Sequence, residues 1–187
     1  HFWAKKALDF GKHVLVEKSF THDLDIACEL VELATQKNLV VMENFMFLYH
    51  SQQTYVKGEI DSGLIGDVRC FRSSFGFPPL SRDNIRYKKE LGGGSLLDAG
   101  AYPIRASQMF LGGSLSVSAA SLFVDPQLDV DIFGGAFLAN NAGLFSEIAF
   151  GFDNFYQCNY EIWGSLGKIT VSRAFTAGSD FLPQVTI

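Results

Sequence analysis

The chain has 187 residues, enough to bury the core of one ordinary domain or of two small ones. Its 48% of hydrophobic and 19% of charged residues are typical of a globular protein and exclude a disordered one. The net charge of −5 argues against a nucleic-acid partner, because phosphate binding relies on clustered lysine and arginine. No apolar run is long enough to span a bilayer and no signal peptide is visible, so we expect no membrane partner and take the cytoplasm as the default.

The first part of the chain predicts alternating helices and strands. Residues 2–10 have the spacing of an amphipathic helix, which Gly11 ends, and "HVLVEK" over 13–18 predicts a buried strand. A second helix is predicted over 24–37, capped by Thr21 or Asp23, followed by a second buried strand over 39–45. This order is typical of a parallel α/β unit.

The pattern of apolar and polar residues changes after residue 47. A helix is predicted over 51–63, a strand over 67–77, and a helix over 95–111 that Pro103 interrupts. Further strand-like runs, separated by turn residues, predict an antiparallel sheet. They lie at 115–125, 130–140, 144–152 and 155–165, with a last run at 181–187. Both ends of the chain look abrupt, so we expect a piece of a longer protein.

The cysteines, histidines and serines give little indication of a metal site or of a catalytic nucleophile. Cys28, Cys70 and Cys158 lie far apart and predict buried thiols in a reducing compartment. The four histidines have no metal-ligand spacing, so a metal site has little support. No serine lies in a GxSxG context, which leaves serine hydrolysis unsupported.

Polar residues end both strands of the first part. Glu17 and Lys18 end the first strand, and Glu43 and Asn44 end the second. In open α/β sheets, ligands collect at the carboxyl ends of the strands. A lysine there can stabilise negative charge on a substrate oxygen, although the pattern alone favours a solvated strand end.

A second candidate site is "LGGGSLLDAGAYP" over 91–103. Three glycines leave backbone N–H groups accessible where a helix begins, which favours an anion or a close ligand. Asp98 and Tyr102, four residues apart, are expected on one helix face, and a tyrosine hydroxyl can protonate a developing alkoxide. The alternative is a flexible loop before a core helix, and the pattern does not decide between the two.

The charged loop before the glycines contains Arg82 and Arg86. Arginine forks there could hold a phosphorylated or nucleotide-linked ligand, or the loop could simply be a solvated surface. No GxGxxG follows a strand and opens a helix, so the dinucleotide fingerprint is absent from this sequence.

Four spaced motifs together resemble the Gfo/Idh/MocA oxidoreductases. They are "ALDFGKHVLVEKS", "GLIGDV", "GGGSLLDAGAYP" and "IWGSLGKI", and they span nearly the whole chain. Within that family, "ENFMFLYHSQ", "FGFPPL" and "IRYKKELGGGSLLDAGAYP" are most similar to the NDP-hexose 3-ketoreductases.

The resemblance implies an α/β fold class. Residues 1–47 would be the C-terminal part of a Rossmann-type parallel sheet that binds NAD(P), with the phosphate loop upstream. Residues 48–187 would form an α+β domain for substrate binding and dimerisation, with an open, mostly antiparallel sheet that is incomplete at its C-terminus. A homo-oligomer through the sheet face is therefore expected.

The resemblance also implies roles for single residues. Lys18 corresponds to a lysine that contacts substrate and the nicotinamide ribose, and Glu17 and His13 belong to the same cofactor motif. Asp98 corresponds to a substrate-binding aspartate. Tyr102 stands where many members carry histidine and corresponds to the proton donor of the ketoreductases.

One residue departs from the family pattern. Ser19 replaces the usual proline after the Glu-Lys pair, which removes the main physical reason for a cis peptide bond there.

The implied activity is NAD(P)-dependent reduction of a keto group on a nucleotide-linked sugar. Tyr102 would protonate the oxygen, Lys18 would stabilise it, Asp98 would orient a sugar hydroxyl, and Arg82 or Arg86 would meet a diphosphate. The alternatives are oxidation of a sugar or cyclic diol by the same fold, and a truncated, non-catalytic dimerisation fragment. The sequence leaves open which sugar is bound, whether NAD or NADP is used, and whether this chain is active by itself.

Overall fold

The computed structural model describes residues 1–178, 182 and 184–187. The chain divides into two compact units, His1–Phe45 and Met46–Ile187. The strand-like run predicted at 181–187 lies partly outside the described residues, and its described part contains strand β9, Val185–Thr186.

The first unit has the predicted order of helix, strand, helix and strand. These elements are α1 (Phe2–Asp9), β1 (Val14–Glu17), α2 (Leu24–Gln36) and β2 (Val41–Asn44). The two strands are parallel, and Glu17 lies opposite Asn44 at their carboxyl ends. Asp23 caps α2 as expected, because its carboxylate accepts a hydrogen bond from the backbone N–H of Ile26.

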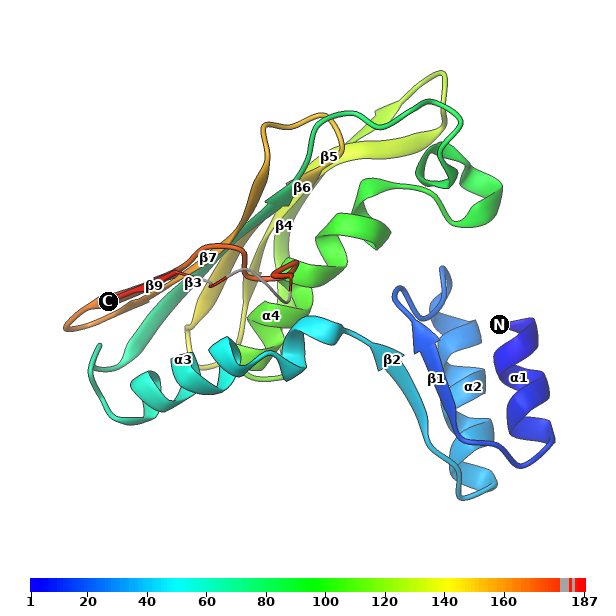
Figure 1. Cartoon of the computed structure of the whole chain (residues 1–187), viewed down its shortest axis with the longest axis horizontal. Coiled ribbons are helices and arrows are strands. Elements are labelled where there is room, and N and C mark those ends of the chain that lie inside the picture. The colour runs from blue at the N-terminus through cyan, green and yellow to red at the C-terminus, as the bar shows by residue number, and fades with distance from the viewer. Residues whose placement is uncertain (179–181, 183) are drawn as a thin grey trace. The chain divides into compact units, whose positions relative to one another are not determined.

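The core of the first unit lies on one side of the strand pair, where both helices pack (Figure 1). Leu8 and Leu30 are fully buried there, against Val14 and Val16 of β1. Leu15 points the other way and is 63% exposed. The prediction of a fully buried first strand is therefore wrong: side chains alternate along a strand, and the helices cover one face of it.

The second unit is built on one seven-stranded sheet in the order β4-β5-β6-β3-β7-β8-β9. Its pairs are antiparallel except for β3 with β6, so the predicted mostly antiparallel sheet is confirmed. Besides β9, the strands are β3 (Val68–Gly76), β4 (Ser116–Asp125), β5 (Val130–Ala139), β6 (Phe145–Gly151), β7 (Gln157–Gly164) and β8 (Lys168–Val171).

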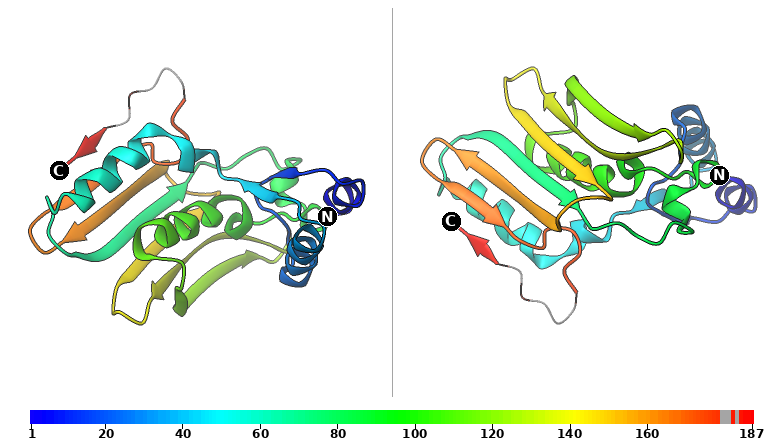
Figure 2. Two further views of the ribbon diagram at one scale, coloured as in Figure 1. Left: turned by 90° about the horizontal axis from the view of Figure 1, so that it is seen from below. Right: turned by 90° about the horizontal axis from the view of Figure 1, so that it is seen from above.

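Two α-helices, α3 (Ser51–Asp61) and α4 (Ala101–Leu111), lie on the same face of this sheet (Figure 2). A π-helical turn, Leu96–Gly100, leads into α4. Three short 3₁₀ turns complete the described elements, at Met46–Tyr49, Ile85–Tyr87 and Lys89–Leu91. The opposite face of the sheet carries no helix in the described part of the chain (Figure 2).

The interruption expected at Pro103 takes the form of an irregular turn and not of a break. Pro103 is the third residue of α4, and the helical backbone runs on from the preceding π-helical turn, so its missing N–H removes a helical hydrogen bond there. The π-helical turn directly before α4 is the irregular part of this segment.

The space between helices and sheet is filled by aromatic rings. Phe71 of β3, Phe110 of α4 and Tyr160 of β7 contact one another with centroids 5.1–5.6 Å apart. The buried Tyr160 hydroxyl donates to Oε1 of Gln53 over 2.7 Å, and its burial raises the pKa of Tyr160 far above the ordinary value. Tyr160 is thus a structural residue, held as a neutral phenol.

Two of the family-like motifs, "GLIGDV" and "IWGSLGKI", contact each other. The backbone N–H groups of Ser165 and Leu166 donate to the carbonyls of Asp67 and Ile65, both over 2.9 Å. A side chain at Gly164 would place its Cβ 2.1 Å from the Ile65 carbonyl oxygen. Gly164 therefore allows the two loops to approach each other closely, which is a structural role.

The three cysteines differ in their burial. Cys70 and Cys158 are buried as predicted, whereas Cys28 is exposed on the outer side of α2, so the prediction is wrong for that thiol. All three are free.

Among the described residues, no helix has both the length and the apolar character needed to cross a membrane.

Candidate active site

The carboxyl ends of β1 and β2 are joined by side-chain hydrogen bonds. The Asn44 amide donates to the Glu17 carboxylate over 2.8 Å, and the backbone N–H of Phe20 donates to the Glu43 carboxylate over 2.7 Å. Lys18 lies between these two attachments and is partly buried. The Glu-Lys end of the strand is therefore an ordered polar edge rather than a frayed end.

The Lys18–Ser19 peptide bond is cis, so the expectation drawn from Ser19 is wrong. The chain is fixed on both sides of this bond, by the Glu17 and Phe20 hydrogen bonds described above.

His13 lies at the other end of β1. Its Nδ1 accepts a hydrogen bond from the backbone N–H of Val40 over 2.9 Å, which ties together the starts of the two strands. Four strand residues separate it from Lys18, a distance of roughly 13 Å or more in an extended chain. The structure does not bring His13 to the edge that holds Glu17 and Lys18.

In the second unit, Asp98 and Arg86 are brought together. Nε of Arg86 donates to Oδ2 of Asp98 over 2.6 Å in a partly buried ion pair. The backbone N–H of Arg86 donates to the side chain of Asn84, and its carbonyl accepts from the N–H of Gly94. Arg86 is thus fixed within its loop and directed at Asp98, whereas Arg82 is exposed.

The three glycines do not form an open anion site. The N–H groups of Gly93 and Gly94 donate to the carbonyls of Lys88 and Arg86, and Oδ2 of Asp131 accepts from the hydroxyl of Ser95 over 2.7 Å. The same oxygen accepts from the N–H of Leu96 over 2.6 Å. The sequence hypothesis of a ligand at this helix start is wrong, because a carboxylate of strand β5 already occupies it.

Gly94 is required by this arrangement. Its φ of +120° is rarely adopted by residues with side chains, and a Cβ there would lie 2.2 Å from Oδ1 of Asp131. The glycine therefore lets strand β5 approach the start of the helix.

We expect Asp131→Asn to destabilise the protein by about 1–2 kcal/mol, because it replaces a charged acceptor of two hydrogen bonds at a helix start. Urea unfolding followed by circular dichroism measures this. The matched control is Asp129→Asn, which removes an exposed ion pair with Lys89 and suits the positive φ of residue 129. Equal stability of the two variants would contradict the capping role of Asp131.

Tyr102 of α4 packs inside an aromatic cluster. Its ring contacts Phe47, Phe75 and Phe175, with centroids 5.9, 5.1 and 5.6 Å away. The residue is 8% exposed, so its ring is held firmly. Asp98 lies in the π-helical turn and Tyr102 in α4, so the α-helical spacing behind the predicted common face does not hold over the whole interval.

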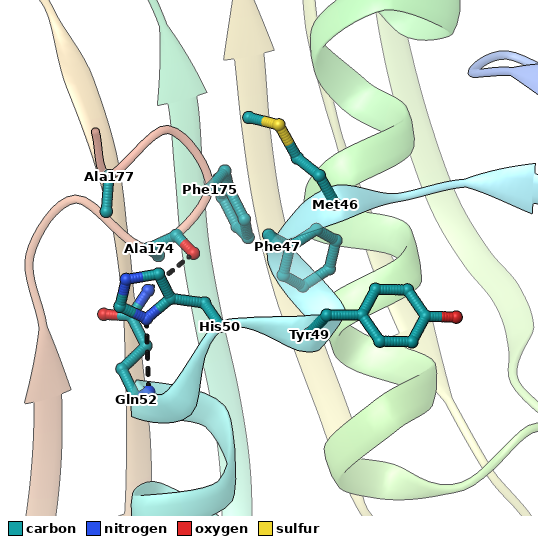
Figure 3. Close-up of a pocket in the computed structure, with 8 residues that line it drawn as sticks. All are labelled: Met46, Phe47, Tyr49, His50, Gln52, Ala174, Phe175 and Ala177. Carbon is teal, nitrogen blue, oxygen red and sulfur yellow. Dashed lines mark hydrogen bonds between the residues drawn. The ribbon is translucent and has the colours of Figure 1, made fainter. Parts of the chain in front are cut away.

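A pocket of about 260 Å³ opens beside this cluster, in the second unit (Figure 3). Phe47 and Phe175 form part of its wall and also contact Tyr102. His50 and Gln52 contribute its polar groups. The full lining is Met46, Phe47, Tyr49, His50, Gln52, Ala174, Phe175 and Ala177.

Sequence reasoning missed three polar residues of the second unit, namely Asp131, His50 and Gln52. Asp131 gave no signal, because its partners lie 35 and 36 positions away in the sequence. His50 and Gln52 stand in the quoted family-like stretch "ENFMFLYHSQ", which was the one available signal for them. Within the described ranges, no group of three or more His, Cys, Asp or Glu side chains is placed to hold a metal ion.

Comparison with known protein families decides the affiliation. The model of the GFO/IDH/MocA C-terminal domain matches residues 54–170, which is more than half of the chain. The chain belongs to the GFO/IDH/MocA family.

Curated GFO/IDH/MocA relatives include two "dTDP-3,4-didehydro-2,6-dideoxy-alpha-D-glucose 3-reductases". The enzyme of Saccharopolyspora spinosa is 43% identical and that of Actinomadura kijaniata 42% identical to this chain. Each alignment covers 99% of this chain and 56% of the relative. The chain thus spans about half the length of these relatives.

Solved structures agree with this affiliation. KijD10, a 3-ketoreductase from Actinomadura kijaniata in complex with NADP and TDP-benzene, is 42% identical, with a TM-score of 0.94. The match covers 98% of this chain and 57% of KijD10. An aldose-aldose oxidoreductase from Caulobacter crescentus has a TM-score of 0.88 at 18% identity, which shows a common fold alone.

Proposed function

We propose that the complete protein is an NADP-dependent reductase of a keto group on a dTDP-linked sugar. The observation that carries this proposal is the match of nearly the whole chain to several 3-reductases of dTDP-sugars at 38–43% identity. Among relatives with other activities, a D-xylose 1-dehydrogenase of Haloferax volcanii is 28% identical over 98% of this chain. A trans-1,2-dihydrobenzene-1,2-diol dehydrogenase of Xenopus laevis is 33% identical, but over only 57% of this chain.

The spacing of two residues supports the assignment of Lys18 and Tyr102 as catalytic residues. KijD10 was solved with a Tyr→Phe and with a Lys→Ala substitution, each in complex with TDP-benzene and NADP. That tyrosine and that lysine are separated by the same number of positions as Tyr102 and Lys18.

The polar edge of the first unit fits part of a dinucleotide. The Glu17 carboxylate and the Lys18 ammonium lie at the carboxyl ends of two parallel strands, where such cofactors bind in this class of sheet. They are suited to ribose hydroxyls, which need an acceptor and a donor. His13 supports the opposite end of the strands, and we do not extend the cofactor site to it.

In the proposed reaction NADPH, when bound, supplies the hydride that adds to the ketone carbon. The Tyr102 hydroxyl donates its proton to the carbonyl oxygen as charge develops there, and the Lys18 ammonium stabilises that oxygen. We assign Asp98, which pairs with Arg86, to substrate binding. Arg82, which is exposed, remains available to the diphosphate, whereas Arg86 is engaged with Asp98.

The main alternative is oxidation of a free sugar or a cyclic diol by the same fold. A test assays the complete protein in both directions, with NADPH and dTDP-linked ketosugars, and with NADP and free sugars or diols. Our proposal predicts NADPH consumption with the dTDP-ketosugars. Turnover of free sugars or diols alone would overturn it. A second alternative is that this chain acts only as a non-catalytic dimerisation piece. Titration of the isolated 187-residue chain with NADPH tests it, because such a piece is expected not to bind the cofactor tightly.

We also propose that the protein forms a homo-oligomer through the helix-free face of its sheet. Aromatic side chains there stack in pairs, Phe123 with Phe133 and Phe137 with Phe145. All of them are exposed except Phe145, which is partly buried. Ion pairs of Arg72 with Glu147 and Glu161 lie on neighbouring strands, and Arg72 also contacts Trp163. Aromatic side chains and arginine are enriched in the cores of protein interfaces.

Phe137→Glu in the complete protein should raise the dissociation constant of the oligomer about 100-fold or more, since it buries an unpaired charge in the proposed interface. Analytical ultracentrifugation measures this. The matched control is Phe155→Glu, because Phe155 is 85% exposed in the loop between β6 and β7. If both variants associate as the parent protein does, the sheet face is not the interface.

For the compartment, we propose the cytoplasm. The three cysteines are all free, and Cys70 and Cys158 are buried separately in strands β3 and β7. Free thiols are typical of proteins that work in a reducing compartment.

A further inference from the structure

The helix that carries Tyr102 is preceded by a π-helical turn. Residues Leu96–Gly100 form this turn, and the backbone N–H of Ala101 donates to the carbonyl of Leu96, five positions earlier. In an α-helix the N–H donates to the carbonyl four positions earlier, so this turn holds one residue more than an α-helical turn does. Single π-helical turns are rare, and they occur frequently at functional sites.

Pro103 accounts for the widening of this turn. In a regular α-helix residue 103 would donate to the carbonyl of Ala99, but proline has no N–H and its ring collides with that carbonyl. Ala99 lies inside the π-helical turn, and a wider turn relieves this collision. Pro103 therefore disfavours the α-helical alternative for the residues directly before it.

Both ends of the π-helical turn are held by strands of the sheet. At its start, Oδ2 of Asp131 in β5 accepts from the hydroxyl of Ser95 and from the N–H of Leu96. At its end, Gly100 is buried, and a Cβ there would lie 3.0 Å from ring atoms of Phe150 in β6. The turn is thus fixed as a body, so a change in its winding must move the residues between its two ends.

Asp98 is the site residue that lies between these ends. Its side chain is 19% exposed, and its Oδ2 accepts from Nε of Arg86 over 2.6 Å. Tyr102 follows four positions later, with its ring packed against Phe75 and Phe175. Successive residues of an α-helix are turned by about 100°, so loss of the extra residue from the turn would rotate Asp98 by up to about that angle relative to Tyr102. The carboxylate would then leave Arg86.

We propose that Pro103 is a positioning residue of the active site, which keeps residues 96–100 in a π-helical turn and thereby holds the Asp98 carboxylate in register with Arg86 and Tyr102. Proline is less favourable than alanine inside a helix, so helix stability alone does not account for it at this place. The part of Asp98 in substrate binding rests on the proposed function, whereas its pairing with Arg86 does not.

The first test needs no substrate. It is a double-mutant cycle in the complete protein that combines Arg86→Met, which removes the ion pair, with Pro103→Ala, which restores the N–H and permits an α-helix. Urea unfolding is followed by circular dichroism. We expect Arg86→Met to lower the unfolding midpoint of the parent, and to lower that of Pro103→Ala by about half as much or less. Equal losses in the two backgrounds would overturn the proposal, because the ion pair would then not depend on the proline.

The second test asks whether Pro103 acts on the substrate through Asp98. Isothermal titration measures binding of a dTDP-linked ketosugar, and of dTDP as the reference without a sugar. Pro103→Ala should bind the ketosugar about 10- to 100-fold more weakly, the loss that one hydrogen bond to a charged group commonly causes, and dTDP equally well. In an Asp98→Asn background the same substitution should cause little further loss. A loss of the same size with and without Asp98 would contradict positioning through this carboxylate.

The two tests separate a failure of this inference from a failure of the proposed function. Coupling in the stability cycle with an unchanged ketosugar affinity would support the positioning of Asp98 by Pro103 and count against the assignment of Asp98 to substrate binding. Absence of coupling would overturn the inference whatever the complete protein binds.

Arg105→Ala is the matched control. Arg105 is exposed in α4, two residues after Pro103, and alanine there also favours the helix while the proline stays in place. This variant should leave the ketosugar affinity and the effect of Arg86→Met unchanged. If Arg105→Ala weakened the effect of Arg86→Met as much as Pro103→Ala does, the turn would respond to any change in α4, and the specific role of the proline would be refuted.

Discussion

Tyr102→Phe in the complete protein should lower kcat for reduction of the dTDP-ketosugar by about 10²–10⁴-fold, the usual contribution of a positioned general acid. The sugar affinity should change little, because phenylalanine keeps the ring contacts with Phe47, Phe75 and Phe175. Steady-state kinetics together with equilibrium binding of the dTDP-sugar separate the two effects.

Tyr87→Phe is the control for loss of a tyrosine hydroxyl. Tyr87 is also buried, and its hydroxyl accepts from the backbone N–H of Leu80 over 3.0 Å. This variant should lose some stability and keep its kcat. An unchanged kcat in Tyr102→Phe would remove Tyr102 from the proposed mechanism.

Lys18→Met should lower kcat by about 10²–10³-fold, as the loss of one oxyanion-stabilising donor typically does. Methionine keeps an unbranched chain of similar length at the partly buried position, so the effect reports the ammonium group. Single-turnover oxidation of NADPH, followed by absorbance, measures this step without product release.

Lys12→Met is the matched control at the other end of β1. Lys12 is exposed and two residues before the strand begins. Its replacement should leave the single-turnover rate unchanged. Equal rates in the two lysine variants would mean that Lys18 serves the fold and not the reaction.

The fold was largely predictable because its signals are local. The apolar spacing within residues 2–10 and 24–37 predicts two amphipathic helices, and Leu8, Leu30 and Ala34 from these sets form the core of the first unit together with Ala4. The large side chains of Phe2, Trp3 and Phe10, which belong to the same predicted pattern, are exposed. The exposure of Leu15 was not predictable, because strand periodicity does not say how many faces a sheet has covered. The form of the irregularity at Pro103, a π-helical turn directly before α4, was not predictable, because the sequence does not say how a helix accommodates a proline.

The candidate site was less predictable, because its contacts join distant residues. The sequence indicated Asp98 and Arg86 separately, but their ion pair depends on the loop that Gly93 and Gly94 close. The glycines suggested an anion site, and the carboxylate of Asp131 that fills it comes from another strand.

The most direct measurement of the proposed activity follows deuterium from cofactor to sugar. The complete protein is incubated with NADPH deuterated at the transferable position of its nicotinamide and with a dTDP-linked ketosugar, and the product is analysed by NMR and mass spectrometry. The proposed reduction predicts one deuterium on the former carbonyl carbon and a proton from solvent on the new hydroxyl. A sugar recovered without deuterium, together with deuterium transfer from a labelled free sugar or diol to NADP, would contradict it.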